Sequence, residues 1–325
     1  MTRREFLGIV GSAAAWPLMV RAQQNKVYRV GYLSLGSPAT EASRFNAFRE
    51  GLAALGYIEG KNLLMEPRWL NGGKYEQLTS LAAELVDQKA DVIVTYSTPG
   101  VSAAKRATTT VPIIFLTVGD AVAVGLVSSL ARPGGNATGI SYFNPELTSK
   151  RLELLKEALP GLAHAAVLFN PDNPATKPVL SAVRSTAQSL QLTLSELAIP
   201  APANQEPAFA AMIDKRVGGF VVTEDPTLIY NTEATAKLAL KYRLAGCGFS
   251  EFAQAGGLLA YGINFVEMWR YGAIVVDKVL KGTKPADIPV EQATKFVMLI
   301  NLKTAKAIGV EVPPTLLARA DEVIE

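Results

Sequence analysis

VPIIFLTVGDAVAVGLVSSLARPGGNATGIS, residues 111–141, contains two predicted strands separated by a helical turn. Residues 111–116 form a short apolar run with β-branched side chains, which predicts a buried strand of a parallel sheet. Residues 126–130 predict a short amphipathic helix, which Pro133 and the two glycines after it end. Residues 136–141 predict a second strand. Polar and aromatic residues follow, so we expect the chain to cross into another domain there.

Strands and helices alternate on both sides of this stretch, with short connections between them. Further strands are predicted at residues 27–33, 63–69, 91–96, 165–169, 192–199, 219–223 and 246–249. Amphipathic helices are predicted between them, for example at residues 40–55 and 231–244, and near the chain end at residues 314–324. Regular alternation of this kind predicts doubly wound parallel sheets.

Several separated stretches resemble one protein family in the same order. They are VGYLSLGS (30–37), LGYIEGKN (55–62), TKFVMLINLK (294–303) and PPTLLARADEVI (313–324). Together with residues 111–141, they resemble ABC-transporter substrate-binding proteins with the type I periplasmic-binding fold, which include tryptophan-binding-like members. The resemblance implies an α/β protein with two doubly wound parallel-sheet lobes joined by a three-crossover hinge.

The resemblance also implies how the chain is divided between the lobes. Residues 23–141 and 263–290 would form the N-terminal lobe, and residues 142–262 and 291–325 the C-terminal lobe. The return crossings follow from the resemblance and not from periodicity. Two independent tandem domains are the alternative, but no flexible linker occurs near residues 141–148 to join them.

The first 22 residues have the features of an export signal. The sequence TRREFL at residues 2–7 contains a twin-arginine pair, and an uncharged run follows from residue 8 to residue 20. Cleavage is expected after Ala22, because small residues precede that point. This segment predicts a twin-arginine signal peptide and a periplasmic protein, whereas an ordinary secretory signal is the alternative.

Composition argues against several classes of function. The chain has 325 residues, a hydrophobic fraction of 49% and a formal net charge of +3, so two sizeable cores are possible and no basic nucleic-acid-binding face is indicated. His164 is the single histidine, with no motif around it, and the single cysteine, Cys247, lies in an apolar run typical of a buried thiol. Without triad, metal or phosphate-loop motifs, we expect no enzyme, no metal and no cofactor.

Polar residues just after predicted strands are the candidates for ligand binding, because open α/β sheets bind ligands at the carboxyl ends of their strands. The candidates are Ser34, Ser37, Ser97, Thr98, Thr117 and Asp120 from the first lobe, Asn170, Asp172, Glu224 and Asp225 from the second, and Tyr261 and Asn264 near a crossover. Hydroxyls and helix N-termini suit a carboxylate, and acidic groups suit an ammonium. Each of these residues could instead be a turn or cap residue. Tyr96 and Phe249 are interpreted as core.

The resemblance implies an exported solute-binding protein. It would capture a small molecule, an amino acid or a related compound, in the cleft between the lobes and deliver it to a membrane ABC permease with its ATPase. We expect a monomer that binds no nucleic acid. A periplasmic ligand sensor of the same fold, acting with a membrane receptor or kinase, is the alternative.

Overall fold

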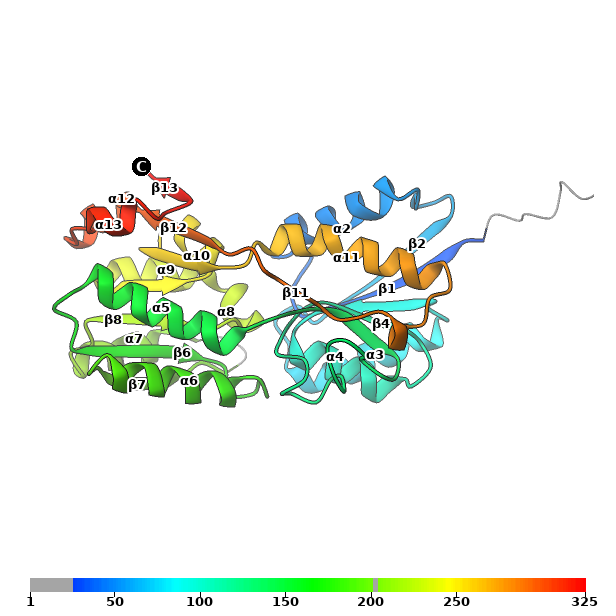
Figure 1. Ribbon diagram of the computed structural model, residues 1–325, viewed down its shortest axis with the longest axis horizontal. Helices are drawn as coiled ribbons and strands as arrows, with labels where there is room; N and C mark the ends of the chain where they lie inside the picture. The colour runs from blue at the N-terminus through cyan, green and yellow to red at the C-terminus, as the bar shows by residue number, and fades with distance from the viewer. Residues whose placement is uncertain (1–25, 201–203) are drawn as a thin grey trace, which may run out of the picture.

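Two lobes lie side by side in the computed structural model, which describes residues 26–200 and 204–325 (Figure 1). The predicted signal peptide, residues 1–22, lies outside the described residues. The first lobe is coloured blue and cyan with a late orange segment, and the second lobe runs from green to red. Late segments of the chain therefore return to the first lobe. No helix in the described part of the chain combines the length and the apolar character needed to cross a membrane.

The first lobe is built on a six-stranded parallel sheet in the order β11-β5-β4-β3-β1-β2. Its strands are β1 (Tyr28–Ser34), β2 (Leu63–Trp69), β3 (Val92–Thr95), β4 (Ile113–Gly119), β5 (Ala137–Tyr142) and β11 (Glu291–Gln292). Its helices are α2 (Ala42–Ala54), η2 (Tyr75–Gln77), α3 (Leu78–Asp87), α4 (Ser97–Ala107), α11 (Phe265–Leu280) and η3 (Pro285–Asp287). Helices α2 and α11 pack together on one face of the sheet, and α3 and α4 cover the other (Figure 1).

The second lobe is built on a seven-stranded sheet in the order β13-β12-β10-β9-β8-β6-β7. Its strands are β6 (His164–Phe169), β7 (Thr193–Ala198), β8 (Gly219–Val222), β9 (Ala245–Gly248), β10 (Leu259–Gly262), β12 (Val297–Asn301) and β13 (Glu322–Ile324). Its helices are α5 (Asn144–Ala158), α6 (Thr176–Ser189), α7 (Glu206–Asp214), α8 (Pro226–Ile229), α9 (Thr232–Lys241), α10 (Ser250–Gln254), α12 (Leu302–Ile308) and α13 (Pro314–Leu317). All pairs are parallel except β10 with β12. The α/β fold with two mainly parallel lobes is confirmed.

In residues 111–141, the two predicted strands form and the predicted helix does not. Strands β4 and β5 pair in parallel, and Gly139 has a φ of 155°, where a Cβ atom would overlap the Phe115 carbonyl. The expected helix at residues 126–130 does not form. The N–H groups of Leu126 and Val127 both donate to the Ala121 carbonyl, and Gly125 has a φ of 71°. Left-handed backbone at the glycine ends the turn before a helix can propagate.

The end of the chain also differs from expectation. The predicted helix at residues 314–324 stops after one turn, α13, and the chain then extends as β13. The Asp321 backbone N–H donates to the Met298 carbonyl at 2.9 Å, and the Met298 N–H donates to Asp321 Oδ2 at 2.8 Å. These two bonds place β13 beside β12. Pairing with the edge of the sheet is therefore more favourable for these residues than continuing the helix.

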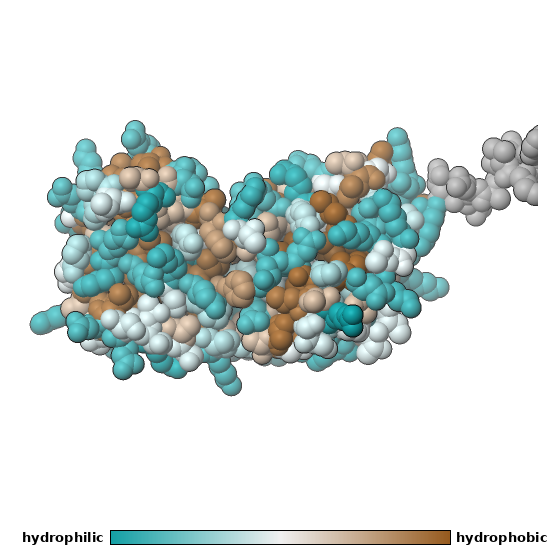
Figure 2. All heavy atoms as spheres, viewed as in Figure 1, coloured by the Kyte–Doolittle hydropathy of each residue, from teal (hydrophilic) through white to brown (hydrophobic). Residues whose placement is uncertain are grey.

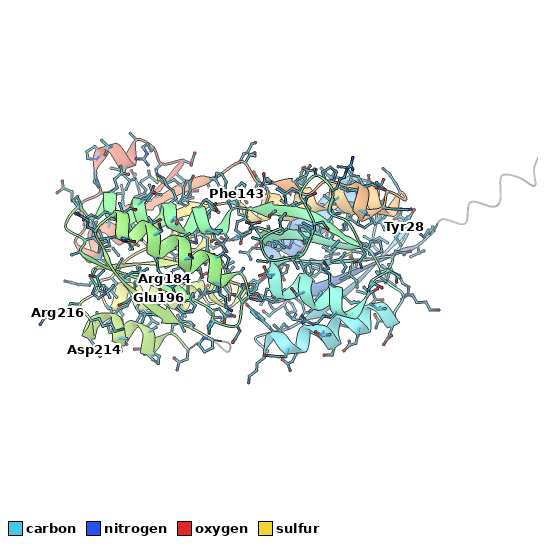
Figure 3. All side chains as sticks on the ribbon, turned by 60° about the horizontal axis from the view of Figure 1, so that its bottom comes forward. Tyr28, Phe143, Arg184, Glu196, Asp214 and Arg216 are labelled. Atoms are coloured by element: carbon cyan, nitrogen blue, oxygen red, sulfur yellow. The ribbon has the colours of Figure 1, made fainter. Side chains whose placement is uncertain are left out.

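Three segments connect the lobes. The chain leaves the first lobe after β5 through Phe143, returns after β10 into α11, and leaves again after β11 towards β12. Phe143 is 42% exposed and lies at the junction of the lobes (Figure 3). Figure 2 shows polar and charged side chains spread over both lobes, with smaller apolar areas that include this junction. Connections this short allow the lobes to move as rigid bodies about a hinge.

Cys247 lies in β9 with no exposed surface, which confirms the predicted buried thiol. Burial raises its pKa to about 12. The thiol is therefore neutral at physiological pH and acts as a small apolar side chain.

Candidate functional site

Two pockets lie where the lobes meet. The inner pocket has a volume of about 20 Å³ and is enclosed by residues of both lobes. Its aromatic wall consists of Tyr96, Tyr142, Tyr230, Phe265 and Trp269. The outer pocket has a volume of about 310 Å³ and shares Pro226 and Tyr230 with the inner pocket. Small-ligand sites usually have volumes of about 300 Å³ or more, so of these two pockets the outer one reaches that range and the inner one does not.

The polar groups of the inner pocket begin at the N-terminus of α4. Ser97 is the first residue of this 11-residue helix, has a φ of 60° and lines the pocket. The first N–H groups of a helix have no partner within it and favour a negative group. Thr98 is 2% exposed, and its Oγ1 has no hydrogen-bond partner within residues 26–200 and 204–325. Thr117 lines the same pocket, at a register shift of β4 between Phe115 and Val118 that changes the direction of side chains.

Glu224 supplies a carboxylate to the inner pocket from the second lobe. Its Oε1 pairs with Arg151, and both side chains are buried. Arg151 also donates to the carbonyls of Tyr261 at 2.7 Å and Val222 at 2.8 Å. Glu224 Oε2 is buried without a hydrogen-bond partner among the described residues, and burial raises the pKa of this carboxyl although Arg151 lowers it. A buried acceptor without a partner favours a ligand that brings a donor.

A second buried carboxylate, Glu41, lies in the first lobe just before α2. Ser34 Oγ donates to Glu41 Oε2, and the Tyr96 hydroxyl lies 3.1 Å from the same oxygen. The Tyr230 hydroxyl, from the other lobe, lies 3.0 Å from Glu41 Oε1 and 2.6 Å from the Tyr96 hydroxyl. Burial raises the pKa of the Glu41 carboxyl, and these hydroxyl groups partly offset the rise. We call Ser34, Glu41, Tyr96 and Tyr230 the Glu41 cluster.

A third buried carboxylate, Asp225, caps α8 in the second lobe. Its Oδ1 accepts from the Thr227 N–H at 2.8 Å and from Asn170 Nδ2 at 3.1 Å, and its Oδ2 accepts from Asn173 Nδ2 at 2.8 Å. The Tyr75 hydroxyl, from the first lobe, lies 3.0 Å from each oxygen. Burial raises the pKa of Asp225, and its hydrogen-bond donors lower it in part. We call these five residues the Asp225 cluster.

Arg44 forms the third polar contact between the lobes. It lies on α2 with 5% exposure, and its guanidinium donates to Glu251 Oε1 of the second lobe at 2.5 Å. The guanidinium carbon lies 4.5 Å from the centre of the Phe265 ring and 5.6 Å from that of Trp269, which is within the range of cation–π attraction. Contacts from Arg44, Tyr75 and Tyr230 therefore join the two lobes in a closed arrangement.

Most of the predicted binding residues lie at this junction. Ser97, Thr117 and Glu224 line the inner pocket, and Ser37 lines the outer pocket. Four others are buried beside the pockets, either in the Glu41 and Asp225 clusters or at the start of α4: Ser34, Thr98, Asn170 and Asp225. Polar groups that are distant in sequence thus converge between the lobes.

Four predicted binding residues neither line these two pockets nor lie among the buried residues beside them: Asp120, Asp172, Tyr261 and Asn264. Asp120 accepts from the Ala123 N–H at 3.0 Å, and Asn264 caps α11 by accepting from the Glu267 N–H at 3.2 Å. Asp172 is exposed in a turn, and the Tyr261 ring lies 5.9 Å from that of Phe296. In this arrangement all four have turn, cap or packing contacts.

Sequence reasoning missed the aromatic wall and two charged residues. Glu41 and Arg44 lie three residues apart at the start of the first predicted helix, and Arg44 and Phe48 lie four apart, so a charged pair shares a face with apolar residues. That pattern was a usable signal. Tyr96 was interpreted as core, and it is both buried and part of the pocket wall. Nothing local distinguishes Tyr230 or Trp269 from other aromatic residues.

The chain is similar to proteins that bind small solutes. The family model described as ABC transporter substrate binding protein matches residues 35–324. A tyrosine-binding protein of Clostridioides difficile (strain R20291) is 28% identical over 267 residues, which cover 81% of this chain and 76% of that protein.

Two solved structures illustrate the likeness in three dimensions. The ABC domain from Streptococcus pneumonia in complex with L-Trp has a TM-score of 0.83 at 24% identity and covers 92% of this chain and all of that chain. The ligand-free, open structure of a substrate-binding protein with adhesive properties from Clostridium difficile has a TM-score of 0.65 at 25% identity, and covers 92% of this chain and 99% of that one. Because the family match extends over residues 35–324 and the fold agrees, this chain belongs to the ABC transporter substrate-binding protein family.

Proposed function

We propose that this protein is an exported receptor that captures an amino acid between its lobes and delivers it to a membrane ABC permease with its ATPase. The observation that carries the proposal is the inner pocket, where one lobe contributes a group that favours a negative charge and the other lobe a group that favours a positive charge. Ser97 at the start of α4 favours a carboxylate, and the free Oε2 of Glu224 favours an ammonium group. Neither group alone would select a zwitterion.

The aromatic wall supports an aromatic side chain on the ligand. Trp269 and Tyr96 lie with their ring centres 5.0 Å apart, and Phe265 meets Trp269 edge to face at 6.1 Å. The aromatic ring of a ligand could pack against these three rings with favourable edge and face contacts. The relatives named for tyrosine and for L-Trp agree with such a ligand.

Export rests on the sequence of residues 1–22. The twin-arginine pair, the uncharged run and the small residues before residue 23 support delivery of a folded protein to the periplasm. A receptor role without catalysis is consistent with the motifs found in the sequence. Among the residues that the structure describes, no cluster of three or more metal-ligating side chains occurs.

Calorimetry on residues 23–325, unfolded and refolded to remove bound ligand, would test the proposal. L-tyrosine and L-tryptophan should bind. Tyramine, which lacks the carboxylate, and 3-(4-hydroxyphenyl)propionate, which lacks the ammonium group, should each bind at least tenfold more weakly. The Glu224→Gln variant should lose at least tenfold in affinity for the amino acids, because an amide N–H would face the ammonium group. Glu196→Gln, at an exposed ion pair, is the control. Equal binding of all four compounds would overturn the zwitterion assignment.

A further inference from the structure

Tyr230 lies between hollow spaces on several sides. It follows α8 and lines the inner pocket, the outer pocket and a third groove of about 590 Å³, which is also lined by Glu233 and Lys237. Its backbone N–H donates to the Pro226 carbonyl at 2.9 Å, so the backbone is held while the side chain borders open space. The phenol ring can therefore change rotamer without disturbing α8.

The hydroxyl of Tyr230 completes a site that belongs to the other lobe. Ser34 and Tyr96 both approach Oε2 of Glu41, whereas Tyr230 alone among the described hydrogen-bond donors meets Oε1. Glu41 has no exposed surface, so an Oε1 without a partner would be costly. When Tyr230 moves away, another donor has to take its place.

The inner pocket is too small for an amino acid while Tyr230 occupies its present position. Its volume of about 20 Å³ is close to the space needed by one water molecule. The other large walls are fixed: the Tyr96 hydroxyl accepts from the Leu35 N–H at 2.7 Å, and Trp269 Nε1 donates to the Tyr32 hydroxyl at 2.6 Å. Arg44 is held by Glu251. Among the residues that line the inner pocket, Tyr230 is the one that also lines both the outer pocket and the third groove.

From these observations we infer that Tyr230 competes with the ligand for its own site. Its phenol occupies the Glu41 end of the inner pocket when no ligand is bound, and it turns towards the outer pocket when a ligand enters. The donor of the ligand, a phenol hydroxyl or an indole N–H, then meets Glu41 Oε1. This inference rests on the proposed function and adds a specificity-determining residue, since an aromatic ligand without a terminal donor would leave Glu41 Oε1 unpaired.

Calorimetry with two tyrosine variants tests the competition. Tyr230→Phe keeps the ring and loses the hydroxyl that binds Glu41, so displacement becomes easier and L-tyrosine should bind about tenfold more tightly. Tyr75→Phe removes the other interlobe tyrosine hydroxyl, which does not line the inner pocket, and should not tighten binding. Unchanged or weaker binding by Tyr230→Phe would overturn the inference, because Tyr230 would then be an ordinary contact or irrelevant to the ligand.

A second measurement does not depend on an amino acid being the ligand. Tyr230→Ala should leave a phenol-sized cavity that ends at Glu41, so p-cresol should raise the unfolding temperature of this variant and not that of the unmutated protein. Toluene, which has no donor, should have a smaller effect. If no amino acid binds but p-cresol does, the proposed ligand is wrong and the Tyr230 site stands. If p-cresol protects no better than toluene, the Tyr230 site itself is refuted.

Discussion

The two lobes satisfy their buried carboxylates in different ways. In the first lobe, the donors that Glu41 receives from its own lobe are the hydroxyls of Ser34 and Tyr96, and both approach one oxygen. In the second lobe, Asp225 receives three N–H groups from its own lobe, and Glu224 receives an arginine. A hydroxyl can rotate to accept a hydrogen bond instead of donating one, whereas an amide N–H can only donate.

This difference assigns different roles to the lobes in closure. The second lobe presents fixed acceptors, since its N–H donors need a carboxylate oxygen whether the cleft is open or closed. The first lobe presents an adjustable acceptor, because the hydroxyl groups around Glu41 can rotate and let a different donor take their place. We therefore expect the hydrogen bonds around Glu41 in the first lobe to rearrange when a ligand binds, and those around Asp225 and Glu224 in the second lobe to stay as they are.

The largest effect in this comparison is expected at the arginine of the second lobe. Arg151→Met would leave the Glu224 carboxylate buried without a cation and would remove donors from the Tyr261 and Val222 carbonyls. Breaking a buried ion pair typically costs about 3–5 kcal/mol of the free energy of unfolding. Urea unfolding monitored by circular dichroism would measure this loss.

Arg184→Met is the matched control, because Arg184 pairs with Glu196 on the outer surface of the same lobe, where the two residues lie side by side (Figure 3). Solvent screens that pair, and its loss should not measurably change the free energy of unfolding. Equal destabilisation by the two substitutions would show that the second lobe does not depend on its buried arginine.

A matched pair of amide substitutions compares the two clusters directly. Asp225→Asn places an NH₂ group against N–H donors from Asn170, Asn173 or Thr227, and should lower the free energy of unfolding by about 3 kcal/mol. Glu41→Gln should cost about 1 kcal/mol or less, because the surrounding hydroxyls can accept from the new amide. Urea unfolding of both variants at one pH measures the difference. A larger loss for Glu41→Gln would reverse the assignment of fixed and adjustable acceptors.

Periodicity was sufficient to predict the order of strands and helices, because both sheets are covered by helices and their strands are continuous apolar runs. It failed where an interaction distant in sequence decides the outcome. Residues 314–324 contain apolar residues at helical spacing, but the edge of β12 pairs with β13. Residues 126–130 contain three apolar residues as well, but the glycine at residue 125 and the bonds to Ala121 prevent a helix.

The site was predictable in part for a similar reason. Thr117 lies near the end of a strand and Glu224 just after one, so their position at the carboxyl edge of a sheet follows from local sequence. Arg44 enters the pocket from α2 of the first lobe and Tyr230 from the end of α8 of the second, and their partners are 207 and 189 residues away. Only the closed arrangement of the two lobes brings such residues together, and no local pattern encodes that arrangement.

The pH dependence of stability would sharpen the comparison further. Burial raises the pKa of Glu41 above its usual value of 4.5, so the folded protein holds the proton more tightly than the unfolded chain does. Its contribution to stability is complete below about pH 4.5 and is lost as the pH rises through the raised pKa. Relative to Glu41→Gln, the unmutated protein should therefore lose stability as the pH increases over this window.

Urea unfolding of both proteins in steps from about pH 3 to neutral pH would test this sign, because the change at Glu41 is expected above pH 4.5 and that of the control below it. Glu206→Gln serves as a control of opposite sign, because Lys241 and Tyr242 lower the pKa of the exposed Glu206. That group contributes stability above its usual pKa of 4.5 and loses it as the pH falls through the lowered value. Parallel pH profiles for the unmutated protein and Glu41→Gln would mean that Glu41 keeps an ordinary pKa.

The smallest effect on the free energy is expected at the contact between Tyr75 of the first lobe and Asp225 of the second. Tyr75→Phe removes a hydroxyl that lies 3.0 Å from both oxygens of Asp225, but the three N–H donors of the second lobe remain. The closed arrangement should lose about 1 kcal/mol relative to the open one, and the radius of gyration from small-angle X-ray scattering should increase. Tyr242→Phe, whose hydroxyl donates to Glu206 within one lobe, should leave the radius unchanged. An unchanged radius in Tyr75→Phe as well would mean that this contact follows closure without stabilising it, and that Arg44 and Tyr230 hold the lobes together.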